Sequence, residues 1–305
     1  GRQLQRELQR TGSVNVPRFL LRRGLRIWPL YFIWVAFLAL ALGKWRGLWP
    51  DLVFLSNYLQ GRVSGGWSLS TEEQFYLVVP LLLLGVQRLF GPRGQAWVPL
   101  GLLVLMPVVR AVTLHGMGEA GFDRIYGPIH THCDGLLVGL FLAWVSLKRP
   151  AALSPEQAHP WRWPVLAILG GFVLREIDRP LFSFSGLGLV YGGIVTLGLR
   201  AGPRVRHLTA WRGFHVLSRL SFGMYLNHFE VLPRILPGTT RALVPVLGSG
   251  PLLAAVAFLV AVLSSALVAS VTFVLIEDPF LALRDRWEAL HRPVRPVEPV
   301  LRRVS

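Results

Sequence analysis

The apolar residues of this chain are gathered into long blocks, and this clustering limits the folds open to it. The blocks cover residues 27–43, 74–87, 96–111, 134–147, 163–174, 184–199, 217–236 and 251–276. Hydrophobic residues make up 52% of the 305 positions and charged residues only 16%, unlike an ordinary soluble domain. A membrane-spanning helix needs about 20 mostly apolar residues, so the shorter blocks must borrow flanking residues or tilt. We therefore predict an all-α fold, a polytopic transmembrane helical bundle of about eight helices.

The excess of positive charge fits the topology of such a bundle. The formal net charge is +16. If the residues before Ile27 are cytoplasmic and the blocks alternate, 23 Lys and Arg residues fall on the cytoplasmic side and 9 on the outer side. This asymmetry predicts that both ends of the chain are cytoplasmic. Because no soluble segment is long enough to form a basic face with aromatic platforms, we expect no nucleic-acid binding.

One membrane domain is predicted over residues 1–280, followed by a basic tail over residues 281–305. The tail is punctuated by proline and suits a solvated or lipid-surface segment on the cytoplasmic side. The chain opens on Gly1, with neither an initiating Met nor a signal peptide, so we expect it to be the remainder of something longer. The single cysteine, Cys133, excludes an intramolecular disulfide and a Cys-based zinc cluster.

Three arginines stand directly before the first apolar block. Arg22 and Arg26 are four residues apart and Arg23 and Arg26 three apart, so on a helix their guanidinium groups can converge at the cytoplasmic membrane boundary. Such a cluster suits a phosphate-bearing ligand. The alternative, which the residues alone favour, is a topogenic cluster that contacts anionic lipid.

A polar segment before the second block holds a carboxylate without an evident structural role. Ser70 and Glu73 have the spacing of a capping box at a helix N-terminus. Glu72 is left over, and a carboxylate that enters the bilayer beside Tyr76 is costly unless it faces a polar cavity. A functional Glu72 and a second dipole or interface role are equally compatible with the sequence. The segment is predicted to lie at the outer end of its span.

Histidines mark two further positions. His130, His132 and Asp134 alternate, so an extended backbone would put them on one face, where they could bind a metal. This signal is weak, and we predict a polar network at the outer mouth, or plain loop polarity, and no metal. His228 lies inside a predicted span, where it must be either an interhelical hydrogen-bonding group or a cavity residue.

In their order along the chain, five segments resemble the membrane-bound acyltransferase family 3. They are residues 22–31, 67–80, 130–140, 220–228 and 276–280. The resemblance covers nearly the whole chain, and the second segment is its most specific part. It implies a complete core of about ten helices, against about eight here. Such proteins move an acyl group, usually acetyl from cytoplasmic acetyl-CoA, onto a hydroxyl of a carbohydrate or lipid-linked sugar in a bacterial-type cytoplasmic membrane.

The resemblance also implies roles for individual residues. Arg23 and Arg26 form the family's Arg-x-x-Arg motif and, with Arg22, would bind the anionic donor. Glu72 and His228 are the candidate catalytic residues, Glu72 orienting a catalytic group or the acceptor hydroxyl and His228 in the cavity wall. No tightly bound cofactor is expected, and acetyl-CoA is a co-substrate. The predicted substrate-cavity residues are Trp67, Ser68, Tyr76, His130, His132 and Asp134.

Two departures from the family pattern matter. Relatives usually carry two further spans before the arginine motif, and the first supplies an essential His that acts as base or acyl relay. This chain begins after that point, so we expect a truncated fragment rather than a degenerate member. His132 stands where relatives often have Arg, which predicts a lost or pH-dependent anion contact.

The sequence therefore predicts a membrane O-acyltransferase. Its expected partners are acyl-CoA, a glycan or lipid-linked sugar acceptor, and membrane lipids. The alternative is a non-catalytic protein on the same scaffold, either a transporter or an assembly partner. A transporter would exchange substrate without consuming CoA.

Overall fold

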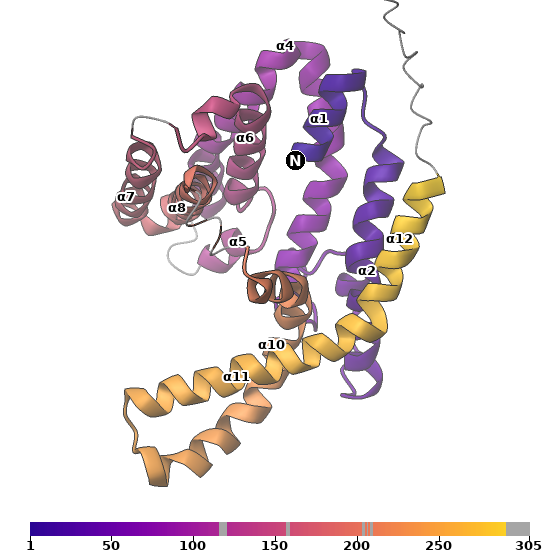
Figure 1. Cartoon of the computed structure of the whole chain (residues 1–305), viewed down its shortest axis with the longest axis vertical. Coiled ribbons are helices and arrows are strands. Elements are labelled where there is room, and N and C mark those ends of the chain that lie inside the picture. Colours follow the sequence, from indigo (N-terminus) through magenta and orange to yellow (C-terminus); the bar gives the residue numbers. More distant parts are fainter. Residues whose placement is uncertain (116–120, 157–158, 203–204, 206, 208–209, 291–305) are drawn as a thin grey trace, which may run out of the picture.

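The computed structural model is built of helices joined by short connections (Figure 1). The structure describes residues 1–115, 121–156, 159–202, 205, 207 and 210–290. Within these ranges there is no strand, and helix covers all or most of each predicted apolar block. The all-α prediction is confirmed.

The long helices are α2 (Val16–Leu40), α4 (Gly66–Leu114), α6 (Asp134–Lys148), α7 (Arg162–Ile177), α8 (Arg179–Arg200), α10 (Arg212–Leu247) and α11 (Pro251–Thr272). The shorter elements are α1 (Arg2–Thr11), α3 (Trp49–Leu52), α5 (Phe122–Tyr126), the 3₁₀ turn η2 (Pro150–Leu153), the π-helical turn η3 (Phe273–Glu277) and α12 (Asp278–Leu290). Local signals explain two of the starts. Asn15 caps α2 by accepting from the Arg18 amide, and Asp178 caps α8 by accepting from the Leu181 amide.

Within the described part of the chain, four helical segments are long and apolar enough to cross a membrane: Val16–Leu40, Gly66–Leu114, Arg179–Arg200 and Pro251–Leu290. The second is two rods joined at a kink, because Gly91 adopts a φ of 63° directly before a proline. Helices α6 and α7 have 15 and 16 residues, short of the roughly 20 needed to span. The predicted number of eight crossings stays a prediction.

Two clusters of buried side chains hold the helices around the polar interior. One joins α2 to the start of α4 and includes Tyr31, Leu38 and Leu69. The other packs Leu4 and Leu8 of α1 against Val79 of α4 and Leu140 of α6. The amphipathic α1 thus lies against the bundle along its apolar side.

The glycine-rich blocks form regular helices, and two of their glycines explain why α7 and α8 approach so closely. A Cβ atom added at Gly171 would lie 2.5 Å from the carbonyl oxygen of Gly186, and one added at Gly186 would lie 2.5 Å from that of Gly171. Any larger residue at either site would separate the two backbones. Glycine therefore serves helix packing here.

The C-terminal third of the chain has a different arrangement. Helices α10 and α11 form a hairpin that extends away from the other helices, and α12 lies alongside α2 (Figure 1). Within the hairpin, Asn227 donates to the Ser265 carbonyl at 3.0 Å. Residues 281–290, the start of the predicted tail, continue α12, and residues 291–305 lie outside the described part.

Candidate functional site

A cavity of about 430 Å³ lies between the start of α4, the loop before α6, and α8. Its lining consists of Trp67, Ser68, Thr71, Glu72, His132, Gly135, Leu136, Phe184, Leu187, Gly188 and Tyr191. Four of the residues predicted from sequence, Trp67, Ser68, Glu72 and His132, meet here although they come from segments about 60 residues apart. A concave site with a few convergent polar groups is the usual form of a small-molecule site.

Glu72 is the carboxylate of this cavity, and Arg23 of α2 holds it. The Arg23 Nη2 donates to Glu72 Oε2 at 2.6 Å, and Arg23 Nε lies 3.7 Å from Glu73 Oε1. The guanidinium also lies 4.1 Å from the centre of the Tyr76 ring. The cation is thus shared between two carboxylates and an aromatic face, which fixes the direction of the Glu72 carboxylate.

This contact corrects the predicted placement of Arg23 and Glu72 at opposite membrane boundaries. Helix α2 begins at Val16, eleven residues before the predicted apolar block. Arg23 therefore lies inside the helix and not at its N-terminal end. The first rod of α4 runs alongside, and Phe19 contacts Tyr76 with ring centroids 5.9 Å apart. The two charged residues therefore meet within the bundle.

The predicted capping box is also wrong. Helix α4 starts at Gly66, after Gly65 with a φ of 75°, so Ser70 already lies in the second turn. Its hydroxyl hydrogen bonds with that of Ser56 at 2.8 Å. Glu73 accepts instead from the indole Nε1 of Trp28 at 3.0 Å. Because the left-handed Gly65 directly precedes the helix, the helix begins before Ser70 and Glu73, which therefore cannot form its N-terminal cap.

The other two arginines make no hydrogen bond with Glu72 among the contacts described, and each has a different acidic neighbour. Arg22 pairs with Glu288 of α12 at 2.7 Å. Arg26 is exposed and lies close enough to Glu277 of η3 to interact electrostatically. Residues four apart share one face of a helix, whereas Arg23 is rotated by about 100° from Arg22. Arg22 and Arg23 therefore have separate partners and do not form one three-arginine cluster with Arg26.

His132 enters the cavity from the loop before α6, in a fixed orientation. Its Nδ1 hydrogen bonds with the Tyr126 carbonyl oxygen, and a carbonyl only accepts, so Nδ1 carries the proton. The ring stacks on Phe184, with centroids 3.9 Å apart, and on Trp67 at 5.6 Å. Burial lowers the pKa of His132 below its ordinary value. The neutral ring therefore has Nε2 left as a hydrogen-bond acceptor.

Asp134 does not line the cavity, because Arg110 binds it in the interior. The guanidinium donates to both Asp134 oxygens, at 2.8 and 3.3 Å, and to the Thr131 carbonyl at 2.9 Å. The Ser185 hydroxyl donates to Asp134 as well. Sequence reasoning missed Arg110, although an arginine inside an apolar block was a usable signal, since such a charge needs a buried partner. The network fixes the residues on both sides of His132.

The remaining predicted residues lie outside this cavity. His130 is exposed, and its Nδ1 hydrogen bonds with the Tyr58 hydroxyl at 3.0 Å. His228 on α10 hydrogen bonds through Nδ1 to the Tyr225 carbonyl at 2.6 Å, and its ring lies tilted against that of Phe229 with centroids 3.9 Å apart. His130, His132 and Asp134 thus have three separate sets of contacts. The predicted roles of His130 and His228 stay predictions, whereas Asp134 is a residue of the buried interior and not of this cavity.

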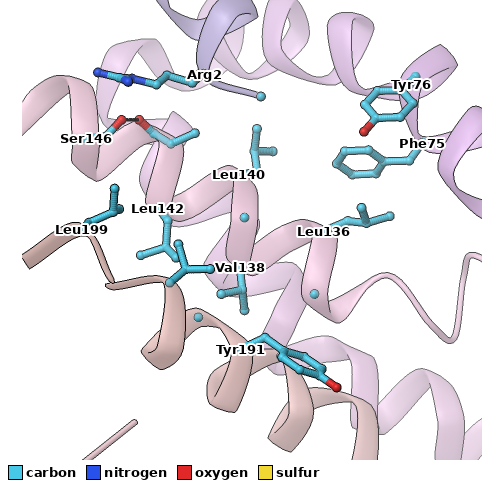
Figure 2. Close-up of a pocket in the computed structure, with 17 residues that line it drawn as sticks. Arg2, Phe75, Tyr76, Leu136, Val138, Leu140, Leu142, Ser146, Tyr191 and Leu199 are labelled. Carbon is cyan, nitrogen blue, oxygen red and sulfur yellow. Dashed lines mark hydrogen bonds between the residues drawn. The ribbon is translucent and has the colours of Figure 1, made fainter. Parts of the chain in front are cut away.

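Tyr76 lines a second cavity of about 440 Å³ that adjoins the first (Figure 2). The two share Gly135, Leu136, Gly188 and Tyr191. Figure 2 shows apolar side chains of α6, among them Val138 and Leu140, along its wall. The polar cavity at Glu72 therefore continues into an apolar one.

Comparison with known proteins adds a functional context to this geometry. The chain is 28% identical over 180 residues to "Putative peptidoglycan O-acetyltransferase YrhL" of Bacillus subtilis, covering 54% of this chain. It is 26% identical over 251 residues to "Acyltransferase MdmB" of Streptomyces mycarofaciens, covering 72% of this chain. It is 22% identical over 227 residues to "O-acetyltransferase OatA" of Staphylococcus aureus, covering 70% of this chain.

The matched segments span 28%, 62% and 35% of the lengths of YrhL, MdmB and OatA. No protein-family model and no solved structure matches the chain. The similarities relate this chain, whose described residues form helices of which four are able to cross a membrane, to proteins named as acyltransferases.

Proposed function

We propose that this protein is a membrane O-acyltransferase that moves an acyl group, in the first instance acetyl, from acyl-CoA to a hydroxyl of a carbohydrate or lipid-linked glycan. The observation that carries the proposal is the cavity in which Glu72, fixed by Arg23, lies with His132 and the Trp67 ring. The names of all three relatives support acyl transfer, and those of YrhL and OatA support transfer to oxygen. We propose a bacterial-type cytoplasmic membrane, with both ends of the chain cytoplasmic, on the basis of the charge asymmetry.

The chemistry needs few groups. The acceptor oxygen attacks the thioester carbonyl carbon, the carbon–sulfur bond breaks, and the CoA thiolate leaves. A base takes the hydroxyl proton and then returns it to the thiolate. Glu72 would orient the hydroxyl by accepting its hydrogen bond. The Nε2 of neutral His132 would be a second hydrogen-bond acceptor in the same cavity. Arg23 acts on the acceptor through Glu72.

The aromatic residues around His132 support a sugar-bearing acceptor. Trp67 packs against Tyr126 with ring centroids 4.7 Å apart, and Phe184 covers the other side of the imidazole. Such faces pack against the apolar side of a sugar ring while nearby polar groups bind its hydroxyls. The adjoining apolar cavity offers space for the acyl chain or for lipid attached to the acceptor.

The test is transfer of radiolabelled acetyl from acetyl-CoA to envelope glycans by membranes that contain the full-length protein. We expect label in the glycan fraction that mild alkali releases as acetate, as an O-acetyl ester requires. Membranes without the protein are the control. Consumption of acetyl-CoA with no label in an ester, or no consumption at all, would contradict the proposal.

A further inference from the structure

A second polar cavity, of about 480 Å³, lies between α1 and the N-terminal half of α2. Its basic lining residues are Arg6 and Arg10 from α1 and Arg18 and Arg22 from α2. Each pair is four residues apart, so each occupies one face of its helix, and both faces border the same cavity. We call these residues the four-arginine groove. Its volume lies within the roughly 300–1,000 Å³ of small-molecule sites.

The protein itself leaves most of this charge unneutralised. Within the described part of the chain, Arg22 is the member that has an ion pair, with Glu288. Arg18 is half-buried, and its Nε is buried without a hydrogen-bond partner. The one carboxylate in the lining, Glu7, accepts from the backbone amide of Asn15 at 3.1 Å. It makes no ion pair with the four arginines among the contacts described.

Four cations around one cavity repel one another, and the repulsion is strongest where water is partly excluded. An anion bound between them would remove that cost and satisfy the buried Arg18 Nε. Guanidinium groups bind phosphate oxygens in pairs, so several groups on facing helices suit a ligand with more than one phosphate.

We infer that the four-arginine groove binds the phosphate groups of the nucleotide end of the CoA donor. The inference rests on the proposed function and names the donor subsite. Arg23, the arginine nearest Glu72, is already held by two carboxylates, so the phosphates need other cations. Arg18 lies five residues before Arg23 on α2, about 7.5 Å along the helix. Phe19 lines the groove and contacts Tyr76, whose ring covers Arg23, so the groove leads toward Glu72.

The experiment measures equilibrium binding of CoA and of dephospho-CoA to the full-length protein in phosphatidylcholine nanodiscs. The variants are Arg6→Gln and Arg18→Gln. Arg93→Gln is the matched control, because Arg93 is exposed, two residues after the α4 kink, and outside the groove. We expect each groove variant to bind CoA about tenfold more weakly, the value of one charge-assisted contact. Arg93→Gln should bind like the parent.

The 3′-phosphate of CoA, which dephospho-CoA lacks, provides a second comparison. If the groove holds that group, one of the two groove substitutions costs much less affinity for dephospho-CoA than for CoA. Unchanged CoA affinity in both variants would overturn the inference while leaving acyl transfer open to its own assay. If instead the variants bind CoA like the parent in phosphatidylcholine nanodiscs and differ from it only in nanodiscs of anionic phosphatidylglycerol, the groove holds lipid headgroups and the inference is wrong. No CoA binding by the parent protein would contradict both the inference and the proposed donor.

Discussion

Two arginine–carboxylate pairs within the bundle differ in their access to water. Arg110 and Asp134 are both fully buried, with 0% of either side chain exposed. Arg23 and Glu72 are 21% and 42% exposed, and Glu72 borders a cavity. A sealed pair whose lone pairs and protons are all engaged holds structure together, whereas an open pair keeps an oxygen available to a ligand. The difference separates a structural pair from a candidate catalytic one.

The largest expected effect is on the sealed pair. Arg110→Ala would leave Asp134 buried and without its cation, and would remove the donor that holds Thr131. Breaking one partner of a buried pair costs about 3–5 kcal/mol. We expect a thermal unfolding midpoint in detergent far below that of the parent, or loss of monodisperse protein. A variant as stable as the parent would remove the structural role from this pair.

The open pair should behave in the opposite way. Glu72→Gln keeps the shape of the side chain and removes an ion pair that is partly exposed, so stability should change by no more than about 1 kcal/mol. Acyl transfer should fall about 100-fold, because the group that orients the hydroxyl is lost. Arg23→Gln should cost less, since it acts through Glu72. If Arg23→Gln lowered transfer more than Glu72→Gln did, Arg23 would have to act on a substrate directly.

His132 should give a smaller effect with a pH signature. His132→Phe keeps the stacking on Phe184 and removes Nε2, and we expect about a tenfold loss of transfer. The charged groups near the ring are Asp134 and Arg110, and burial is the largest cause of its lowered pKa. Activity that needs neutral His132 is therefore present above that lowered pKa and lost as pH falls through it, below pH 6.5. The unfolded chain takes the proton more readily, so this group also lowers stability as pH falls from 6.5.

The pH dependence of His132→Phe decides whether this histidine matters. In the parent, the acid limb of the rate profile should lie below pH 6.5, and it should be absent or moved in the variant. An identical profile for both proteins would assign the limb to another group.

The smallest effect is expected for a pair on the surface. Glu176 pairs with Arg179 at 2.7 Å, and both side chains are more than half exposed. Water screens such a pair, so Glu176→Gln should change neither the unfolding midpoint nor acyl transfer. A clear loss of transfer would mean that exposure does not separate structural from functional pairs in this protein.

The fold and several cavity residues could be predicted from the sequence wherever a residue pattern had a single physical explanation. Long apolar blocks must be helices in a bilayer, and the all-helical fold follows from them. The ionisable Glu72 at a span boundary predicts a polar cavity, because an uncompensated carboxylate there is costly, and Glu72 does border a cavity. Trp67, Ser68 and His132 were chosen for the same cavity, and they line it.

Other features depended on choices that the sequence does not record. Gly65 starts α4 before the Ser70–Glu73 pattern, so the capping box never forms. The start of α2 at Val16 moved Arg23 inward to Glu72. The sequence predicts Asp134 as a cavity residue because its partner, Arg110, is 24 residues away in another helix. Pairings between helices are set by packing, and local spacing does not reveal them.

The most direct test of the account compares acetyl transfer and thermal unfolding in the parent and in Glu72→Gln, measured on the same preparations. We expect that Glu72→Gln unfolds within about two degrees of the parent and has lost about 99% of transfer. Transfer at the parental rate by a stable Glu72→Gln protein would contradict the claim that chemistry takes place in this cavity.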